Sequence, residues 1–222
     1  MKKLFFILTT IIFFSTDVLA DDCSDISVNP VISVSYSFGK LSIDKSKDVN
    51  AISEIAKSFN LAEHDTFTRG LATANVKYDI SIQTAAHPIG IKQFCIVPAN
   101  VKILISLENP TIYLANNLQE NSCDYNIVLR HEKTHQQINK TALEYYLPIF
   151  KASVTNIAKK ISAVSVNDMS KIEEATKNLT ESYSNKIAPF VDFIKNEIAK
   201  EQAKLDNKAN YQYEDNLCQE KN

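Results

Sequence analysis

The segment that organises the expected fold reads Asn126-Ile127-Val128-Leu129-Arg130-His131-Glu132-Lys133-Thr134-His135-Gln136-Gln137-Ile138. It contains no Gly or Pro, its apolar residues recur at helical spacing, and positions i and i+4 of a helix lie on one face. His131 and His135 can therefore hold one Zn²⁺ from the same side, which leaves Glu132 free to act as a general base. The pattern His-Glu-x-x-His predicts a metal-dependent hydrolase, in the first place a peptidase.

The two histidines continue an apolar stripe of this predicted helix. Ile127, Ile138 and Ala142 recur with them at helical spacing. A polar pair on a buried stripe needs partners, because burying unpaired polar groups is costly. The simpler alternative is a solvated helix face with two surface histidines, and the stripe favours metal binding over it.

Two histidines do not complete a catalytic zinc site, which usually has three protein ligands and a water. The longer pattern H-E-x-x-H-x-x-G-x-x-H is absent, because Ile138 and Thr141 stand at its glycine and third histidine. The third ligand must therefore come from a distant part of the chain.

A helical hairpin around the turn signal at 165–168 supplies a candidate. In such a hairpin, positions equidistant from the turn face each other, so Glu201 lies opposite His131 and Glu197 lies opposite His135. Glu201 is the expected third ligand, and Glu197 is the next choice. The remaining acidic candidates are Glu144, Glu173, Glu174, Glu181 and Asp206.

Residues 1–20 have the pattern of a secretory signal peptide. A basic start at Met1-Lys2-Lys3 precedes an apolar run from Leu4 to Phe14, and Val18-Leu19-Ala20 suits a cleavage site. The run is too short to span a membrane with these flanks. We expect an exported protein, periplasmic or extracellular, with no membrane anchor after cleavage.

The charge balance narrows the expected partners. Cleavage after residue 20 changes the net charge from −2 to −3, since it removes two lysines and one aspartate. No basic block is present, so nucleic acid is not an expected partner. The expected partner is a peptide or protein substrate.

The four cysteines favour disulfides, because their number is even and the chain is expected to be exported. Cys123 begins the motif helix and Cys218 follows the last helix, so both should lie at one end of a helical bundle. We predict Cys123–Cys218 and, with it, Cys23–Cys95.

The composition divides the chain after about residue 115. The three glycines all lie in the first 90 residues. Residues 21–115 are expected to form strands around one helix at 47–59. Residues 116–222 are expected to be helical and to bind the metal, in one compact domain with the part before them. Strands are expected at 31–38, 76–83, 94–97 and 101–107, and residues 111–114 are either a short last strand or the lead-in to the next helix.

The expected fold class is therefore α+β. A small, mostly antiparallel sheet with one helix is followed by a long helical hairpin or bundle that carries the motif. Pro148 should kink or end the motif helix, and Pro189 should lie in the first turn of a final helix.

These features together resemble bacterial secreted proteins classed as zinc-dependent proteases of unknown function, within the broad zincin group. The resemblance rests on the exported start, the spacing from Cys123 to His135 and the helical second half, and it extends over most of residues 30–218. Gly70–Ala74 and the late Leu205-Asp206 are also similar. The resemblance implies zinc on His131 and His135, with Glu132 as the catalytic base.

A hydrolase of this kind also needs a hydrogen-bond donor for the oxyanion. The sequence offers Tyr113, Tyr145, Tyr146 and His87 without ranking them. Two other functions remain open. One is an exported helical binding or scaffold protein with a degenerate or structural motif, and the other is a metal-handling protein of the cell envelope.

Overall fold

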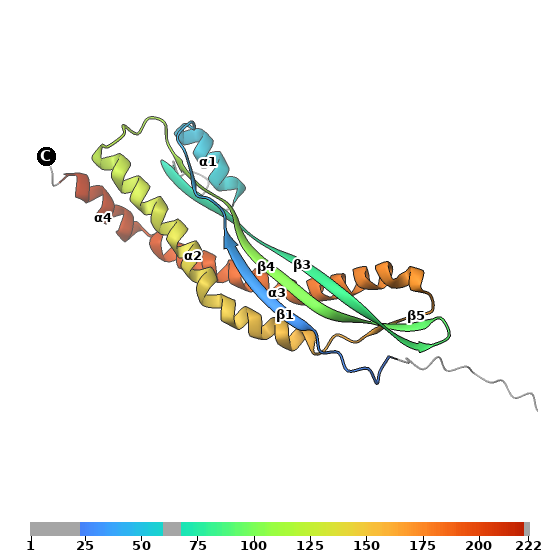
Figure 1. Cartoon of the computed structure of the whole chain (residues 1–222). Helices are drawn as coiled ribbons and strands as arrows, with labels where there is room; N and C mark the ends of the chain where they lie inside the picture. Colours follow the sequence, from blue (N-terminus) through green and yellow to red (C-terminus); the bar gives the residue numbers. More distant parts are fainter. Residues whose placement is uncertain (1–22, 60–67, 220–222) are drawn as a thin grey trace, which may run out of the picture.

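The computed structural model describes residues 23–59 and 68–219, and Figure 1 shows an elongated molecule built along one twisted sheet. The elements in chain order are β1 (Val31–Phe38), β2 (Ser42–Asp44), α1 (Val49–Ser58), β3 (Gly70–Gly90), β4 (Gln93–Leu114), α2 (Cys123–Ala158), β5 (Val164–Val166), the 3-10 turn η1 (Met169–Lys171), α3 (Ile172–Leu205) and α4 (Lys208–Gln219).

Strand β4 is the centre of a mixed five-stranded sheet. β1 and β2 pair with it in parallel, and β3 and β5 pair with it in antiparallel fashion. The long β3–β4 hairpin turns at Lys92, which has a positive φ of 61°. The sheet therefore joins segments far apart in the sequence, because residues 31–38 lie beside residues 100–107.

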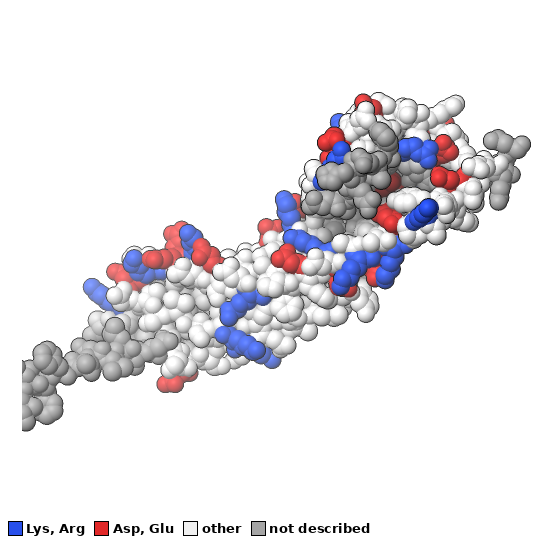
Figure 2. Space-filling view, turned by 180° about the vertical axis from the view of Figure 1, so that it is seen from behind, with Lys and Arg blue, Asp and Glu red and all other residues white. Residues whose placement is uncertain are grey.

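One face of the sheet carries the core. On β4 the alternate residues Val101, Ile103, Ile105 and Leu107 are buried. Along most of β3 every second side chain packs toward the core, and the side chains between them face solvent. Helices α2 and α3 contact each other and also strands β3 and β4. Their apolar residues join the β4 residues in a single cluster. Figure 2 shows acidic and basic side chains intermixed on the side of the molecule that it displays.

The predicted fold class is wrong. The sheet is mixed, with two strands parallel to β4, and the helices pack on it instead of forming a separate hairpin. The segments expected as three strands between 94 and 114 merge into one. Pro98 does not interrupt it, because it pairs with Thr84 beside a register shift, where a missing N–H is tolerated.

Two local predictions are confirmed. The strand expected at 31–38 is β1, and the helix expected at 47–59 is α1. Asp48 caps α1, and its side chain accepts a hydrogen bond from the backbone N–H of Ala51.

Pro148 does not end its helix, so of the two predicted alternatives only a kink remains, and the prediction that Pro189 lies in the first turn of a helix is wrong. Pro148 lies inside α2 and Pro189 lies inside α3, and both helices continue past them. Buried residues stand on either side of each proline, such as Leu143 and Phe150 in α2. This packing outweighs the cost of a helical proline, about 3 kcal/mol. Figure 1 shows α2 changing direction along its length.

Both predicted disulfides are confirmed. Cys23 is bonded to Cys95, and Cys123 at the start of α2 is bonded to Cys218 in α4. Two disulfides fit an oxidising compartment. The expected signal peptide at 1–20 lies outside the described residues. Within residues 23–59 and 68–219, no helix has the length and apolar character needed to cross a membrane.

Candidate metal centre

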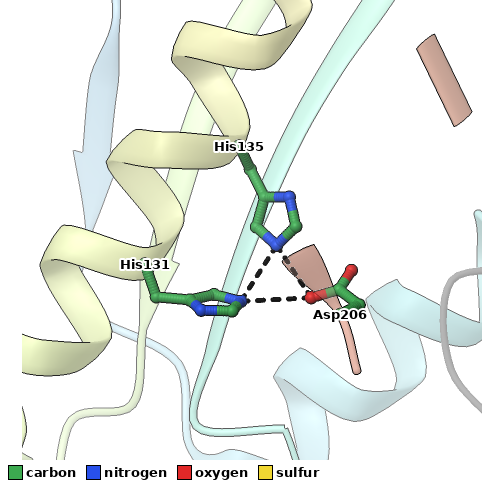
Figure 3. A group of neighbouring side chains, drawn as sticks. All are labelled: His131, His135 and Asp206. Carbon is green, nitrogen blue, oxygen red and sulfur yellow. Dashed lines mark hydrogen bonds and ion pairs between the residues drawn. The ribbon is translucent and has the colours of Figure 1, made fainter. Parts of the chain in front are cut away.

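Three side chains from two distant segments meet at one point. His131 and His135 lie one turn apart on α2, and Asp206 follows the last residue of α3. The Nε2 atoms of the two histidines are 3.0 Å apart, and Asp206 Oδ1 lies 3.1 Å from that of His131 and 2.9 Å from that of His135. Figure 3 shows both imidazoles directed at this carboxylate. These three atoms can hold one metal ion.

The triangle fits one face of a tetrahedral zinc site. With metal–ligand distances near 2.0 Å, tetrahedral ligand atoms lie about 3.3 Å apart. The three observed separations, 2.9 to 3.1 Å, are close to this value and nearly equal. An ion above the triangle would touch all three atoms and keep a fourth position for water or substrate.

Hydrogen bonds alone do not account for all three close contacts. A carboxylate only accepts, and each Nε2 carries at most one hydrogen. If both imidazoles donate to Asp206, their two N–H groups face each other at 3.0 Å. If one Nε2 atom instead accepts a hydrogen bond from the other, the accepting atom carries no hydrogen and cannot donate to Asp206. A cation satisfies all three atoms at once.

The other ring nitrogens are held by polar partners. His131 Nδ1 donates to the buried Glu214 of α4 at 2.9 Å, and Arg130 approaches the second oxygen of Glu214 at 3.3 Å. Gln202 of α3 bonds to His135 Nδ1 and donates to the backbone oxygen of His135 at 3.1 Å. Partners of this kind turn the Nε2 lone pair of a histidine toward a metal.

Glu132 lies in the wall of the site between α2 and β3. Glu132 is buried, and burial raises its pKa to about 7. The attraction of the two histidines and a hydrogen bond from the backbone of Ala72 lower the pKa but do not outweigh burial. Gly70 permits this approach, because a Cβ there would lie 2.8 Å from Glu132 Oε1 and 2.4 Å from a methyl group of Val128. A carboxyl group with a pKa near neutrality suits a general base.

The ionisation of the cluster favours an anionic Asp206. Burial alone would raise the pKa of Asp206, but hydrogen bonds from His131, His135 and Tyr211 hold it well below its usual range. Burial alone would lower the pKa of His131 and of His135, because it disfavours the charged imidazole. Asp206 and nearby Glu132 outweigh burial and raise both pKa values. In the metal-free protein the imidazoles therefore hold their protons more tightly beside Asp206, and a bound cation would take the place of those protons.

The structure brings His131, Glu132 and His135 together as predicted, and it places Asp206 where a third ligand is needed. Glu201 instead pairs with Lys204 at 2.6 Å, and Glu197 bonds to Lys200 and Tyr146. Neither belongs to the described group of ligand atoms.

The hairpin register explains the difference. It assumed a turn at 165–168, whereas α2 ends at Ala158, β5 pairs with β4, and α3 begins at Ile172. Gln202 thus faces His135 in place of Glu197. Asp206 was among the remaining acidic candidates, and Leu205-Asp206 also carried part of the family resemblance.

The site contains residues that the sequence did not single out: Gln202, Glu214 and Tyr211. The Tyr211 hydroxyl donates to Asp206 Oδ1 at 2.7 Å. Among the donors that the sequence offered, Tyr146 is engaged by Glu197, and Tyr145 and His87 are exposed. Residues on a short, polar C-terminal helix leave no spacing signal that points to a site on α2.

No protein-family model, curated protein or solved structure matches this chain. The family resemblance seen in the sequence therefore stays an expectation, and the functional argument rests on the geometry of the site.

Proposed function

We propose that this protein is an exported zinc-dependent hydrolase, and that it acts as a metallopeptidase. One observation carries the proposal. His131, His135 and Asp206 converge within hydrogen-bonding distance of one another, and the buried Glu132 stands next to His131 on the same helix. Three candidate ligands with a carboxyl group beside them match the composition of catalytic zinc centres, which supports the proposal.

The residues have distinct roles in the proposed reaction. Two neutral imidazoles and the Asp206 carboxylate would hold the ion, which would supply Lewis acidity and lower the pKa of a water. Glu132 accepts a proton as the water oxygen attacks the carbonyl carbon of a peptide bond. The carbon–nitrogen bond then breaks, and Glu132 returns the proton to the departing amine.

The two histidines and Asp206 differ in how far solvent reaches them. The side chains of the two histidines are 6% and 10% exposed, whereas that of Asp206 is 40% exposed. The two imidazoles are therefore fixed inside the protein, and solvent reaches part of the Asp206 side chain.

Two histidines and one carboxylate are also the ligand set of non-haem iron(II) sites. The neighbouring Glu132 favours hydrolysis, because activating a water beside the metal requires a base that accepts its proton. We propose zinc for this reason. Metal analysis of purified protein distinguishes the two ions directly.

The test measures metal content and casein hydrolysis on the same samples. We expect one zinc per chain in the wild type, retention of zinc with loss of hydrolysis in Glu132→Gln, and loss of both in His135→Ala. Glu144→Gln is the matched control, because it makes the same chemical change on the exposed face of α2. Absence of stoichiometric metal from the wild type would refute the proposal. A zinc-loaded wild type with no hydrolysis would instead support the binding or scaffold alternative.

A further inference from the structure

Tyr211 contacts two of the three proposed metal ligands, Asp206 and His131. Its hydroxyl donates to Asp206 Oδ1 at 2.7 Å, the same oxygen that faces both histidines. Since a metal–carboxylate bond is about 2.0–2.2 Å long, the hydroxyl lies within about 5 Å of the position an ion would take. That distance is within reach of a group bound at the open coordination position.

The ring of Tyr211 is held against the site. It stacks on His131 with centroids 5.3 Å apart and an interplanar angle of 28°. The residue is nonetheless 46% exposed. One face of the ring is therefore supported by a proposed ligand, while part of the residue stays exposed to solvent.

Other polar groups near the motif are already engaged elsewhere. Thr134 donates to the backbone oxygen of Arg130, Arg130 approaches Glu214, and Gln202 donates to His135 and Asn139. Tyr211 differs from them because the atom to which it donates, Asp206 Oδ1, is itself a proposed ligand atom.

Asp206 has other restraints besides Tyr211. Its backbone N–H donates to the oxygen of Gln202 at the end of α3, and its side chain faces the two histidines. In a metal-loaded site, the ion would fix the carboxylate further. The Tyr211 hydroxyl can then leave Asp206 without releasing it.

We propose that Tyr211 is a catalytic residue whose hydroxyl turns from Asp206 to the oxyanion that forms at the scissile carbonyl. This inference rests on the proposed function and adds to it the missing oxyanion donor. No covalent bond to Tyr211 forms, and its proton stays on the hydroxyl throughout. Such donors act on developing charge and stabilise the transition state more than the bound substrate.

The decisive variant is Tyr211→Phe, which keeps the ring on His131 and removes the hydroxyl. We expect unchanged zinc content, a kcat for casein lower by about 10²–10³-fold, and little change in KM. Tyr213→Phe is the matched control, because Tyr213 lies on the same helix and is exposed. It should behave as wild type.

A binding measurement tests the same point without turnover. Cobalt(II)-loaded protein is titrated with inorganic phosphate, a tetrahedral oxyanion, and separately with thiocyanate, which lacks oxygen. Because hydrogen bonds to charged groups are strong, Tyr211→Phe should weaken phosphate binding by about tenfold or more and leave thiocyanate binding unchanged.

Three results would overturn the assignment. Equal phosphate affinity in wild type and Tyr211→Phe excludes the oxyanion contact. Equal kcat excludes a catalytic role. A weaker zinc affinity with full activity at excess zinc shows that Tyr211 only positions Asp206. If the wild type contains zinc and Glu132→Gln is inactive, these results refute only the role of Tyr211. If the wild type contains no metal, the proposed function is refuted as well.

Discussion

Glu214 on α4 accepts a hydrogen bond from His131 Nδ1 on α2, with 2.9 Å between the two atoms. Glu214 is also the buried residue of its helix, and Arg130 lies 3.3 Å from its other oxygen. The C-terminal helix therefore contacts the site through a carboxylate that orients a ligand, and its most buried side chain is a polar one.

This contact predicts that Glu214→Ala weakens zinc binding. Loss of the carboxylate frees the His131 ring to rotate and makes its nitrogen a poorer ligand, which typically costs 10–100-fold in metal affinity. The measurement is a competition titration against a chromophoric chelator. Asp215→Ala is the control, because Asp215 is adjacent in sequence and its side chain is 65% exposed. Equal losses in both variants would mean that α4 is merely destabilised.

The second prediction concerns the two disulfides, which have different relations to the site. Cys123–Cys218 ties α4 to the start of α2, and α4 carries Glu214 and Tyr211. Cys23–Cys95 ties the N-terminal segment to the start of β4, in a separate apolar cluster. The first bond should therefore affect zinc binding and the second should not.

Replacing each pair with serines separates these effects. The sequence separations are 95 and 72 residues, so the chain-entropy contribution is similar for both, roughly 4–5 kcal/mol. We expect both double variants to lose stability in urea unfolding, and only Cys123→Ser/Cys218→Ser to lose zinc affinity under native conditions. Equal zinc affinity in the two double variants would contradict the prediction.

The local part of the site was predictable from the sequence, and the distant part was not. His131, Glu132 and His135 follow from helical spacing within five residues. Asp206 and Glu214 depend on where α3 ends and on how α4 returns to α2, and tertiary contacts decide both. A hairpin register drawn from a turn signal placed Glu201 opposite His131, but β5 and η1 lengthen that connection.

The same distinction explains the fold. Strand β1 and helix α1 carry their own signals, an alternating pattern and an N-cap, and both were predicted. The parallel pairing of β1 with residues 100–107 has no turn to mark it, because parallel neighbours need a long connection. The Cys123–Cys218 pairing was predictable, because the two ends of the helical segment come together whichever face of the sheet the helices cover.

The third prediction concerns the pH dependence of the metal-free protein. Burial raises the pKa of Glu132 from 4.5 to about 7, so the folded state binds this proton more tightly than the unfolded state. Its stabilising contribution is complete below pH 4.5 and is lost as the pH rises to 7. The raised pKa values of His131 and His135 act in the same direction above pH 6.5. Asp206 has the opposite sign, but its lowered pKa confines its effect to pH below 3.8.

The free energy of unfolding in the presence of EDTA should therefore fall between pH 5 and pH 8. The shift of Glu132 alone corresponds to about 3 kcal/mol. Urea unfolding at several pH values measures it, and Glu132→Gln should flatten the dependence while Glu144→Gln should not. A profile that is identical in wild type and Glu132→Gln would show that Glu132 is not buried as the structure places it.

The last prediction lies in the core. The Tyr183 ring on α3 is fully buried in the cluster between the helices and the sheet, and its hydroxyl has no hydrogen-bond partner among the described residues. Burial raises its pKa to about 12. An unpaired buried hydroxyl costs free energy, so Tyr183→Phe should raise the free energy of unfolding by about 1 kcal/mol.

A second tyrosine provides the contrast. The Tyr78 hydroxyl on β3 is within 3.0 Å of Ser184 Oγ, next to Tyr183 in the chain. Tyr78→Phe makes the same chemical change but breaks a hydrogen bond, so it should lower the free energy of unfolding by about 1 kcal/mol. Both variants should keep the zinc affinity of the wild type, since neither residue contacts the metal centre. If Tyr183→Phe destabilises the protein as much as Tyr78→Phe, then the Tyr183 hydroxyl has a partner, such as a buried water, that stabilises the core.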